Sequence, residues 1–327
     1  MIGFPPPPAP ILEPAALAVA RATFPHPRSY ELAPEKGRAR LVALQAGRGV
    51  EKPVVEEAWV TVDSGSFGTV RTRIVRPAGA RGGLPVVLFL HGGGWVFGDE
   101  TTHDRLAREL ASGAGAAVVF PVYQRAPEAR YPAQIEQSHA VAAWIAGQGG
   151  AHGLDPARIA LVGDSAGGNL AAALTFLAEE RGGPRFRAQV LLYPVTDAGM
   201  DTGSCRQFAD GYYLTRDGMA WFWDQYVPDP SRRAEPYASP LRARTEQLKE
   251  LPPTLVVTGE ADILRDEGEA YAARLREAGV DVTAVRVLGT VHDFLMLDSL
   301  RATRAATVAR KLAVDALRQA LHGQLPS

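Results

Sequence analysis

One serine is framed by glycines where a buried strand is expected to turn into a helix. The stretch "RIALVG" runs into "GDSAGGNLAAALTFLAEE", so Gly163, Ser165 and Gly167 form the pattern G-x-S-x-G. A nucleophilic serine on such a sharp turn leaves no room for side chains two residues before and after it, which explains both glycines. A glycine-rich turn with an N-capping serine gives the same pattern, whereas a phosphate-binding loop would need a following Gly-Lys-Ser/Thr. The context of strand and helix favours Ser165 as a nucleophile.

A serine hydroxyl needs a neighbouring imidazole to take its proton, and the imidazole needs a carboxylate to fix its tautomer. In a strand-turn-helix hydrolase the expected chain order is Ser, then Asp or Glu, then His, on loops after later strands. "TLVVTGEADILRDEG" places Asp262 just beyond one buried strand, and "VRVLGTVHDFLML" places His292 beyond the next. The sequence therefore predicts a triad of Ser165, Asp262 and His292.

Other acids and histidines nearby compete for these roles. Glu260 and Asp266 flank Asp262, while Asp266 and Glu267 are typical of a first helical turn, where carboxylates favour the helix dipole. Asp293 is too close to His292 to come from a separate loop. The alternative for His292 is a loop histidine with a satisfied hydrogen bond, but it alone among seven histidines follows the last strand before a terminal helix. The histidine spacings indicate no metal site.

The stretch "VLFLHGGGWVFG" (residues 87–98) breaks an apolar run into a histidine and three glycines. When a serine adds to a carbonyl, negative charge develops on the oxygen, and preorganised amide N–H groups must point at it. A side chain there would block the approach. We expect His91 to brace this loop, Trp95 to pack beneath it, and Gly93→Ala to reduce turnover much more than stability.

Alternating strands and helices must position these residues. Short and nearly all-apolar strands are expected at 85–90, 116–121, 159–163, 188–194, 254–259 and 282–288. Helical patterns lie between and after them, at 101–112, 132–146, 165–181, 265–278 and 297–321. Apolar runs indicate burial on both faces, as in a parallel sheet between helices, and "AWVTVDS" with "GTVRTRIVRP" predicts an edge hairpin. The fold class is therefore α/β, with a mostly parallel central sheet.

Composition limits the classes of partner. The 327 residues carry a formal net charge of -1, with 46% hydrophobic and 22% charged residues, which favours neither nucleic acid nor an anionic membrane. Cys205 is the only cysteine, so neither an intramolecular disulfide nor a cysteine metal site can form. The first residues do not resemble a secretory signal, and no apolar stretch is long enough to span a bilayer. We expect a soluble, cytoplasmic protein without stable membrane association.

Taken in order, "HGGGW", "GDSAGG", "DILRDEG" and "HDF" resemble the motifs of the hormone-sensitive-lipase-like (family IV) carboxylesterases of the α/β-hydrolase superfamily. The resemblance covers roughly residues 55–320 and includes "YQRAPEARYPAQIEQ" (123–137) and "LLYPVTD" (191–197). It places the same three residues in the triad. It also implies an oxyanion hole formed by the N–H groups of Gly93, Gly94 and Ala166, and a reaction without cofactor or metal.

This chain departs from the family pattern at several positions. Ile263 follows the triad aspartate where the family often has proline, and Gln124 and Arg125 replace the usual arginine and leucine. Asp293 stands after the triad histidine, where glycine is usual. None of these changes removes a catalytic atom, but a carboxylate at this position can raise the pKa of His292.

The long interval between the strands near 194 and 254 is typical of a lid, and the resemblance implies a helical cap built from it and from the N-terminal segment. We therefore divide the chain into an N-terminal cap segment (1–50, with helical patterns at 11–22 and 34–47), a catalytic domain in two parts (51–196 and 251–327) and a cap insertion (197–250). Trp221, Phe222, Trp223 and Tyr226 either line the substrate pocket or bury the cap against the sheet.

The implied function is hydrolysis of short- to medium-chain acyl esters through an acyl-enzyme. The sequence leaves open an amidase or lactonase on the same triad, and a small-molecule-binding relative that has lost catalysis. The resemblance also makes a homodimer the candidate assembly. It does not identify the natural substrate.

Overall fold

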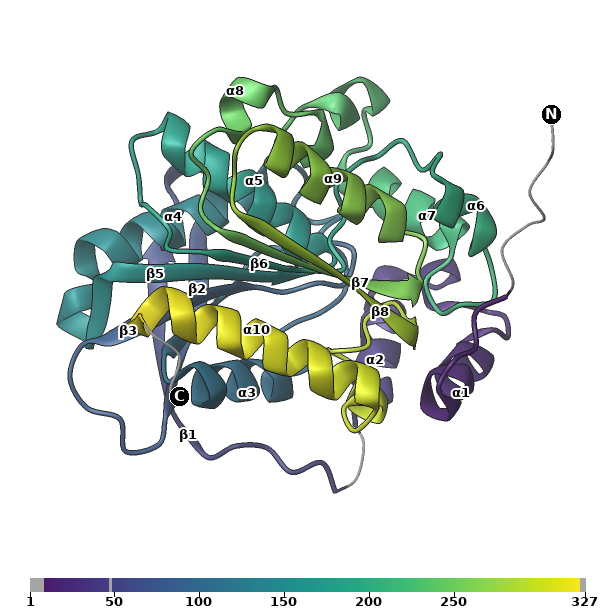
Figure 1. Cartoon of the computed structure of the whole chain (residues 1–327), viewed down its shortest axis with the longest axis horizontal. Helices are drawn as coiled ribbons and strands as arrows, with labels where there is room; N and C mark the ends of the chain where they lie inside the picture. Colours follow the sequence, from purple (N-terminus) through teal and green to yellow (C-terminus); the bar gives the residue numbers. More distant parts are fainter. Residues whose placement is uncertain (1–8, 47–48, 324–327) are drawn as a thin grey trace.

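An eight-stranded sheet forms the centre of the computed structural model, which describes residues 9–46 and 49–323 (Figure 1). The order across the sheet is β1-β2-β4-β3-β5-β6-β7-β8. The strands are β1 (Val55–Asp63), β2 (Thr69–Pro77), β3 (Leu84–Leu90), β4 (Ala117–Val122), β5 (Leu154–Asp164), β6 (Gln189–Leu192), β7 (Thr254–Ala261) and β8 (Val282–Val291). From β4 to β8 all neighbours are parallel, whereas β2 runs antiparallel to both β1 and β4. The predicted edge hairpin and parallel sheet are both confirmed.

The interior strands are buried on both faces, as their continuous apolar sequences indicated. Val86 to Leu90 of β3 have no exposed surface, and the same is true of Ile159 to Val162 of β5. Strand β8 differs from this expectation because it lies at the sheet edge. Its first seven residues are only partly buried or exposed, and Leu288 is 66% exposed.

Helices cover the two faces of the sheet. On one face lie α3 (Asp104–Ala114) and α10 (Arg304–His322), and on the other lie α4 (Ala133–Gln148), α5 (Ala166–Glu180) and α9 (Arg265–Glu277) (Figure 1). Helix α10 begins seven residues later than predicted, because residues 298–300 form a separate 3-10 turn. The side chain of Thr303 then accepts a hydrogen bond from the N–H of Ala306 and begins the helix.

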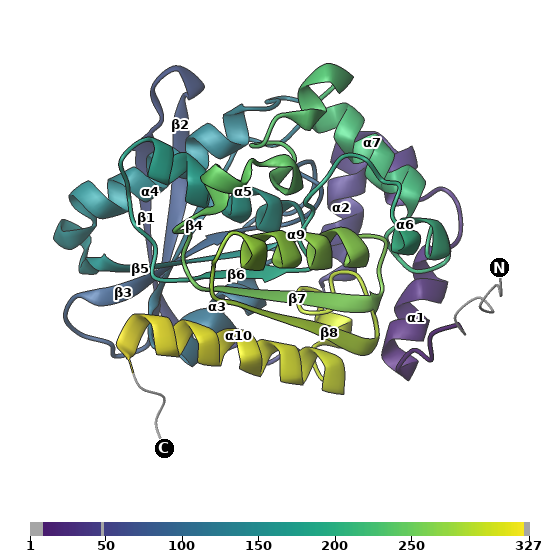
Figure 2. The ribbon, with the colours of Figure 1, turned by 45° about the horizontal axis from the view of Figure 1, so that its top comes forward.

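A second group of helices lies beyond the carboxyl ends of the strands. It contains α1 (Pro14–Thr23), α2 (Pro34–Leu44), α6 (Gly203–Gln207) and α7 (Arg216–Tyr226) (Figures 1 and 2). The first two come from the N-terminal segment and the last two from the insertion between β6 and β7. The turn at 29–31 contacts both α2 and α7 and so joins them. Helix α8 (Thr245–Leu248) instead packs against α9. The predicted end of the second helix, residue 47, falls outside the described residues.

Within residues 9–46 and 49–323, every helix is either too short or too polar to pass through a lipid bilayer.

Candidate active site

Ser165 occupies the sharp turn between β5 and α5. Its backbone has φ 54° and ψ -118°, a strained conformation for a residue with a side chain. A Cβ atom on Gly163 would lie 2.1 Å from the carbonyl oxygen of Gly167, and one on Gly167 would lie 1.9 Å from that of Leu90. Both glycines of the motif are therefore required by close backbone approach, as the sequence predicted.

The structure brings Ser165, His292 and Asp262 into one hydrogen-bonded chain. The Ser165 hydroxyl is 2.9 Å from Nε2 of His292, and Nδ1 of His292 is 2.7 Å from Oδ2 of Asp262. The other carboxylate oxygen of Asp262 accepts a hydrogen bond from the N–H of Leu264 at 2.9 Å. The three side chains come from the ends of β5, β8 and β7 and are almost completely buried. Their order allows a proton to pass from the serine hydroxyl to Nε2 while Asp262 holds the ring.

The charges around His292 stabilise its protonated form. Burial alone lowers the pKa of this imidazole, but the negative charges of Asp262 and Asp293 outweigh burial and raise the pKa to about 9. Asp293 Oδ1 lies 3.4 Å from Nε2 of His292. The effect that the sequence suggested for a carboxylate at position 293 is therefore present in the fold.

The competing acids near Asp262 have other partners. Glu260 accepts a hydrogen bond from the N–H of Gly289, and Asp266 accepts one from the N–H of Ser204. Glu267 lies in the first turn of α9, as predicted, but is buried and accepts hydrogen bonds from the backbone N–H groups of residues 196 and 197. Burial raises the pKa of Glu267 to about 8. In the described part of the chain, no three histidine, cysteine or acidic side chains are grouped closely enough to hold a metal ion.

The three glycines after β3 form a loop beside Ser165. Gly93 and Gly94 have φ values of 100° and 61°, in the region that glycine adopts most easily. A Cβ atom on Gly93 would lie 2.6 Å from the backbone carbon of Phe97, and one on Gly94 would lie 2.2 Å from the ring of Phe222. Gly93→Ala would therefore also displace the loop backbone, and the expectation that it reduces turnover much more than stability stays a prediction.

Asp164 and His103 form a buried ion pair that sequence reasoning missed. Asp164 Oδ1 accepts a hydrogen bond from the N–H of Gly92 at 3.0 Å, and Oδ2 lies 3.2 Å from Nε2 of His103. The other ring nitrogen of His103 lies 2.9 Å from the hydroxyl of Thr102, which donates its own proton to the carbonyl of Asp99. In its protonated form His103 can donate from both ring nitrogens, and the carboxylate of Asp164 favours that form. Burial lowers the pKa of His103, but the charge of Asp164 outweighs burial and raises it.

Comparison with known proteins agrees with this fold. The sequence model of the family described as alpha/beta hydrolase fold matches residues 87–296. The chain belongs to the α/β-hydrolase family. Within it, the predicted membership of the hormone-sensitive-lipase-like group is confirmed.

Similar proteins in this family are named esterases. Carboxylesterase NlhH of Mycobacterium tuberculosis is 38% identical over 291 residues, which cover 88% of this chain and 90% of the relative. Ethyl acetate hydrolase of Pseudomonas putida is 36% identical over 287 residues, which cover 85% of this chain and 87% of the relative. The crystal structure of a thermostable esterase from Pseudomonas putida has a TM-score of 0.91 and 44% identity, covering 98% of this chain and 100% of that one.

In this hydrolase the predicted bracing residues make the expected contacts. Tyr123 stacks on the ring of His91 at 4.1 Å and donates a hydrogen bond to its carbonyl, while Nδ1 of His91 lies 2.8 Å from the carbonyl of Gly92. Burial lowers the pKa of His91 to about 3, so its ring is neutral. Trp95 is fully buried and stacks on Tyr226 at 4.1 Å.

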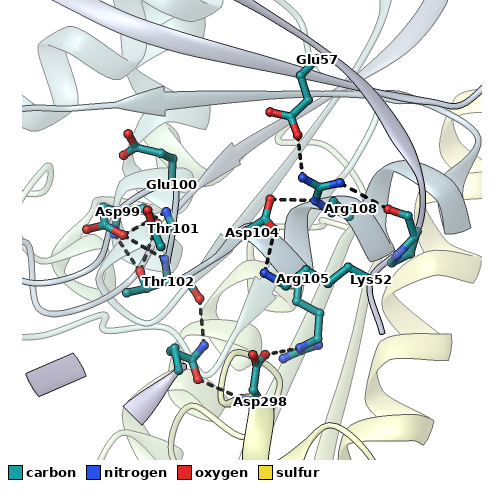
Figure 3. Close-up of polar contacts among 12 residues, drawn as sticks. Lys52, Glu57, Asp99, Glu100, Thr101, Thr102, Asp104, Arg105, Arg108 and Asp298 are labelled. Atoms are coloured by element: carbon teal, nitrogen blue, oxygen red, sulfur yellow. Dashed lines mark hydrogen bonds and ion pairs between the residues drawn. The ribbon is translucent and has the colours of Figure 1, made fainter. Parts of the chain in front are cut away.

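Helix α3 also holds the loop that carries His292. Arg105 donates to the carbonyls of Leu295 and Met296 at 2.7 and 2.8 Å and pairs with Asp298 at 2.5 Å. Figure 3 shows Arg105 and Asp298 in contact, with Asp104 beside Arg108 on the same helix. The amino end of α3 therefore anchors Asp164 through His103 and the His292 loop through Arg105.

A cavity of about 370 Å³ opens onto Ser165 and His292. Its walls come from α1 and α2, from the glycine loop and from the insertion between β6 and β7. Of the four aromatic residues considered for this wall, Phe222 lines the cavity, whereas Trp223 and Tyr226 are fully buried against Trp95. Trp221 packs on Phe97.

Proposed function

We propose that this hydrolase is a serine carboxylesterase that acts on short- to medium-chain acyl esters. The observation that carries the proposal is the hydrogen-bonded chain from Ser165 through His292 to Asp262 at the end of an apolar cavity. The names of the similar proteins support an ester as substrate, because two are a carboxylesterase and an ethyl acetate hydrolase.

In the first half of the reaction, Ser165 Oγ attacks the ester carbonyl while Nε2 of His292 takes the hydroxyl proton. The negative charge on the carbonyl oxygen is stabilised by the N–H groups of Gly93, Gly94 and Ala166. The bond from the carbonyl carbon to the alcohol oxygen then breaks. His292 returns its proton to that oxygen, the alcohol leaves, and the acyl group stays on Ser165.

In the second half, water replaces the alcohol. His292 Nε2 takes a proton from water as its oxygen attacks the acyl carbon, and the same donors stabilise the new oxyanion. The bond to Ser165 Oγ breaks, the proton returns to that oxygen, and the carboxylic acid leaves. Asp262 keeps Nδ1 protonated and stabilises the imidazolium in both halves.

The cavity supports an acyl chain as part of the substrate. Leu41 and Leu44 of α2 face it together with Met219 and Phe222 of α7, which provides an apolar surface for an acyl chain. We propose that α1, α2, α6 and α7 form the cap, in agreement with the division of the chain at 1–50 and 197–250.

The test is a series of p-nitrophenyl esters from acetyl to decanoyl, measured with the unmodified protein and with Ser165→Ala and His292→Gln. Turnover should fall about 10⁴-fold or more in both variants. The exposed residues Ser231 and His152 supply matched controls, Ser231→Ala and His152→Gln, which should leave the rates unchanged. Near-normal hydrolysis by Ser165→Ala would contradict the assignment.

Two further measurements decide between this proposal and its alternatives. A matched pair of ester and amide substrates with the same acyl group should show a clear preference for the ester. A fluorophosphonate probe should label Ser165 in the unmodified protein and fail to label Ser165→Ala. Failure to label the unmodified protein would instead favour a binding protein without catalysis.

A further inference from the structure

Asp293 has a backbone conformation that would suit glycine better. Its φ is 60°, in the left-handed region that side chains rarely adopt. The carbonyl of Asp293 accepts hydrogen bonds from the N–H groups of Met296 and Leu297, both at 2.9 Å, so the backbone alone forms the turn. Glycine would form the same turn without strain. The side chain must therefore contribute something that the turn does not need.

The carboxylate of Asp293 faces the imidazole of His292. Its Oδ1 lies 3.4 Å from Nε2, the nitrogen that also receives the hydroxyl of Ser165. Within the described residues, this oxygen is buried and makes no hydrogen bond. Although Asp293 lines the cavity, this oxygen faces the imidazole of His292.

Tyr213 fixes the orientation of this carboxylate. Its hydroxyl donates a hydrogen bond to Oδ2 of Asp293 at 3.2 Å. Tyr213 also has a left-handed backbone, with φ 74°, and belongs to the insertion between β6 and β7. Two strained residues from distant parts of the chain thus meet in one contact beside His292.

The other groups around His292 define what a second carboxylate can do. Asp262, from the loop after β7, holds Nδ1. Asp164, at the end of β5 and paired with His103, adds a further negative charge. The ring of Tyr193 contacts the imidazole, with 5.0 Å between the ring centroids. When Nε2 is unprotonated, Asp293 faces a lone pair and gains nothing. When Nε2 takes the serine proton, the same carboxylate attracts the new positive charge.

We propose that Asp293, oriented by Tyr213, is a positioning residue that stabilises the His292 imidazolium at Nε2 and thereby sets the pH range of the reaction. The proposal rests on the esterase function proposed above. It assigns a role to a carboxylate that the backbone turn itself does not need.

The direction of the effect follows from the charge. Below its pKa His292 is already protonated and cannot take the serine proton, so kcat/KM should rise with pH through that value. Asp262 and Asp293 together raise the pKa of His292 to about 9 against the opposing effect of burial. Removing the charge of Asp293 at this distance should shift the rising limb of the kcat/KM profile to lower pH by about one unit.

The experiment measures kcat/KM for p-nitrophenyl butyrate against pH, corrected for spontaneous hydrolysis. Asp293→Asn keeps the shape, and Asp293→Gly fits the backbone; both should move the rising limb by about one unit to lower pH. Tyr213→Phe should move it in the same direction by less, because the carboxylate loses the donor that stabilises its charge. Tyr212→Phe, which changes a neighbouring tyrosine packed on Phe208, should leave the limb in place.

A second readout does not depend on hydrolysis. The ring proton of His292, assigned by its loss in His292→Gln, is titrated by NMR in the unmodified protein and in Asp293→Asn. The midpoint should be lower in Asp293→Asn. Equal midpoints, or a reduced kcat with an unmoved pH limb, would overturn the role of Asp293. Absence of ester hydrolysis with a shifted midpoint would instead overturn the proposed function alone.

Discussion

The N–H of Gly92 donates a hydrogen bond to the carboxylate of Asp164 at 3.0 Å, which ties the glycine loop to the residue just before the nucleophile. This hydrogen bond therefore fixes the distance between Ser165 and the N–H groups proposed to bind the oxyanion. The buried ring of His103 lies 3.2 Å from the second oxygen of the same carboxylate.

Asp164→Asn should lower kcat because it weakens this tie. The amide places either an N–H or a neutral oxygen against His103, so the ion pair is lost and the loop shifts. We expect kcat to fall about 10- to 100-fold, with a smaller change in KM. This reduction in kcat should not exceed the reduction caused by removing one oxyanion donor. Steady-state kinetics with p-nitrophenyl butyrate measure this, and Asp155→Asn at a partly exposed site is the control. An unchanged kcat would show that the tie does not position the loop.

Phe222 should control acyl-chain length, whereas its neighbour Trp223 should not. Phe222→Ala enlarges the cavity and should move the preferred p-nitrophenyl ester to a longer chain. Trp223 is fully buried away from the cavity, so Trp223→Ala should reduce the free energy of unfolding by about 3–5 kcal/mol without changing the chain-length profile. Identical profiles for Phe222→Ala and the unmodified enzyme would contradict the cavity as the acyl site.

Arg38 should fasten α2 to the segment after the glycine loop. Its guanidinium donates to the carbonyls of Val96 and Ala126 at 2.8 and 2.9 Å and pairs with Glu128. Arg38→Ala leaves both carbonyls without this donor, and we expect a loss of about 1–3 kcal/mol in the free energy of unfolding, with a lower kcat. Glu128→Ala removes only a partly exposed ion pair and should cost less than about 1 kcal/mol. Denaturant unfolding compares the two variants, and equal losses would argue against the carbonyl contacts.

Glu267 should make the protein less stable as pH rises. Burial raises its pKa to about 8 in the folded state, above the value of 4.5 for an exposed glutamate. The folded protein therefore binds this proton more tightly, and the free energy of unfolding should fall as pH rises from about 4.5 to 8.

The variant Glu267→Gln keeps an oxygen for the N–H groups of Thr196 and Asp197 and removes the titration. It should match the unmodified protein near pH 4.5 and exceed its stability at pH 8 and above. Glu277→Gln, at an exposed site on the same helix, should leave the pH dependence unchanged. A parallel pH dependence in Glu267→Gln and the unmodified protein would exclude this role.

The parts of the site that could be predicted from sequence are those tied to local geometry. Gly163 is required by a contact within the nucleophile turn and Gly167 by the neighbouring end of β3. Asp262 and His292 follow parallel strands whose carboxyl ends share one edge. Each of these features can be recognised from the residues that directly surround it in the sequence. The assembly of the chain into a homodimer and its cytoplasmic location stay predictions.

The parts that sequence could not supply depend on distant partners. The buried ring of His103 is paired with Asp164, 61 residues away, and no pattern around His103 indicates that contact. Asp164 directly precedes Ser165 in the G-x-S-x-G motif, and this position was the one sign in the sequence that it could belong to the site. The prediction that Glu267 lies in the first turn of a helix is correct. Its burial was not predicted, because it depends on contacts with the distant residues 196 and 197. The exposure of β8 depends on its place at the sheet edge, which its apolar residues do not reveal.

The amino end of α3 sets the spacing between nucleophile and base from the side of the sheet opposite α5. His103 and Arg105 are two residues apart, and they fasten the turn before Ser165 and the loop after His292 respectively. Neither of these residues belongs to the segments that wall the cavity. These two anchors of the site therefore lie outside the cavity, and residues of the cavity wall can be replaced without removing either anchor.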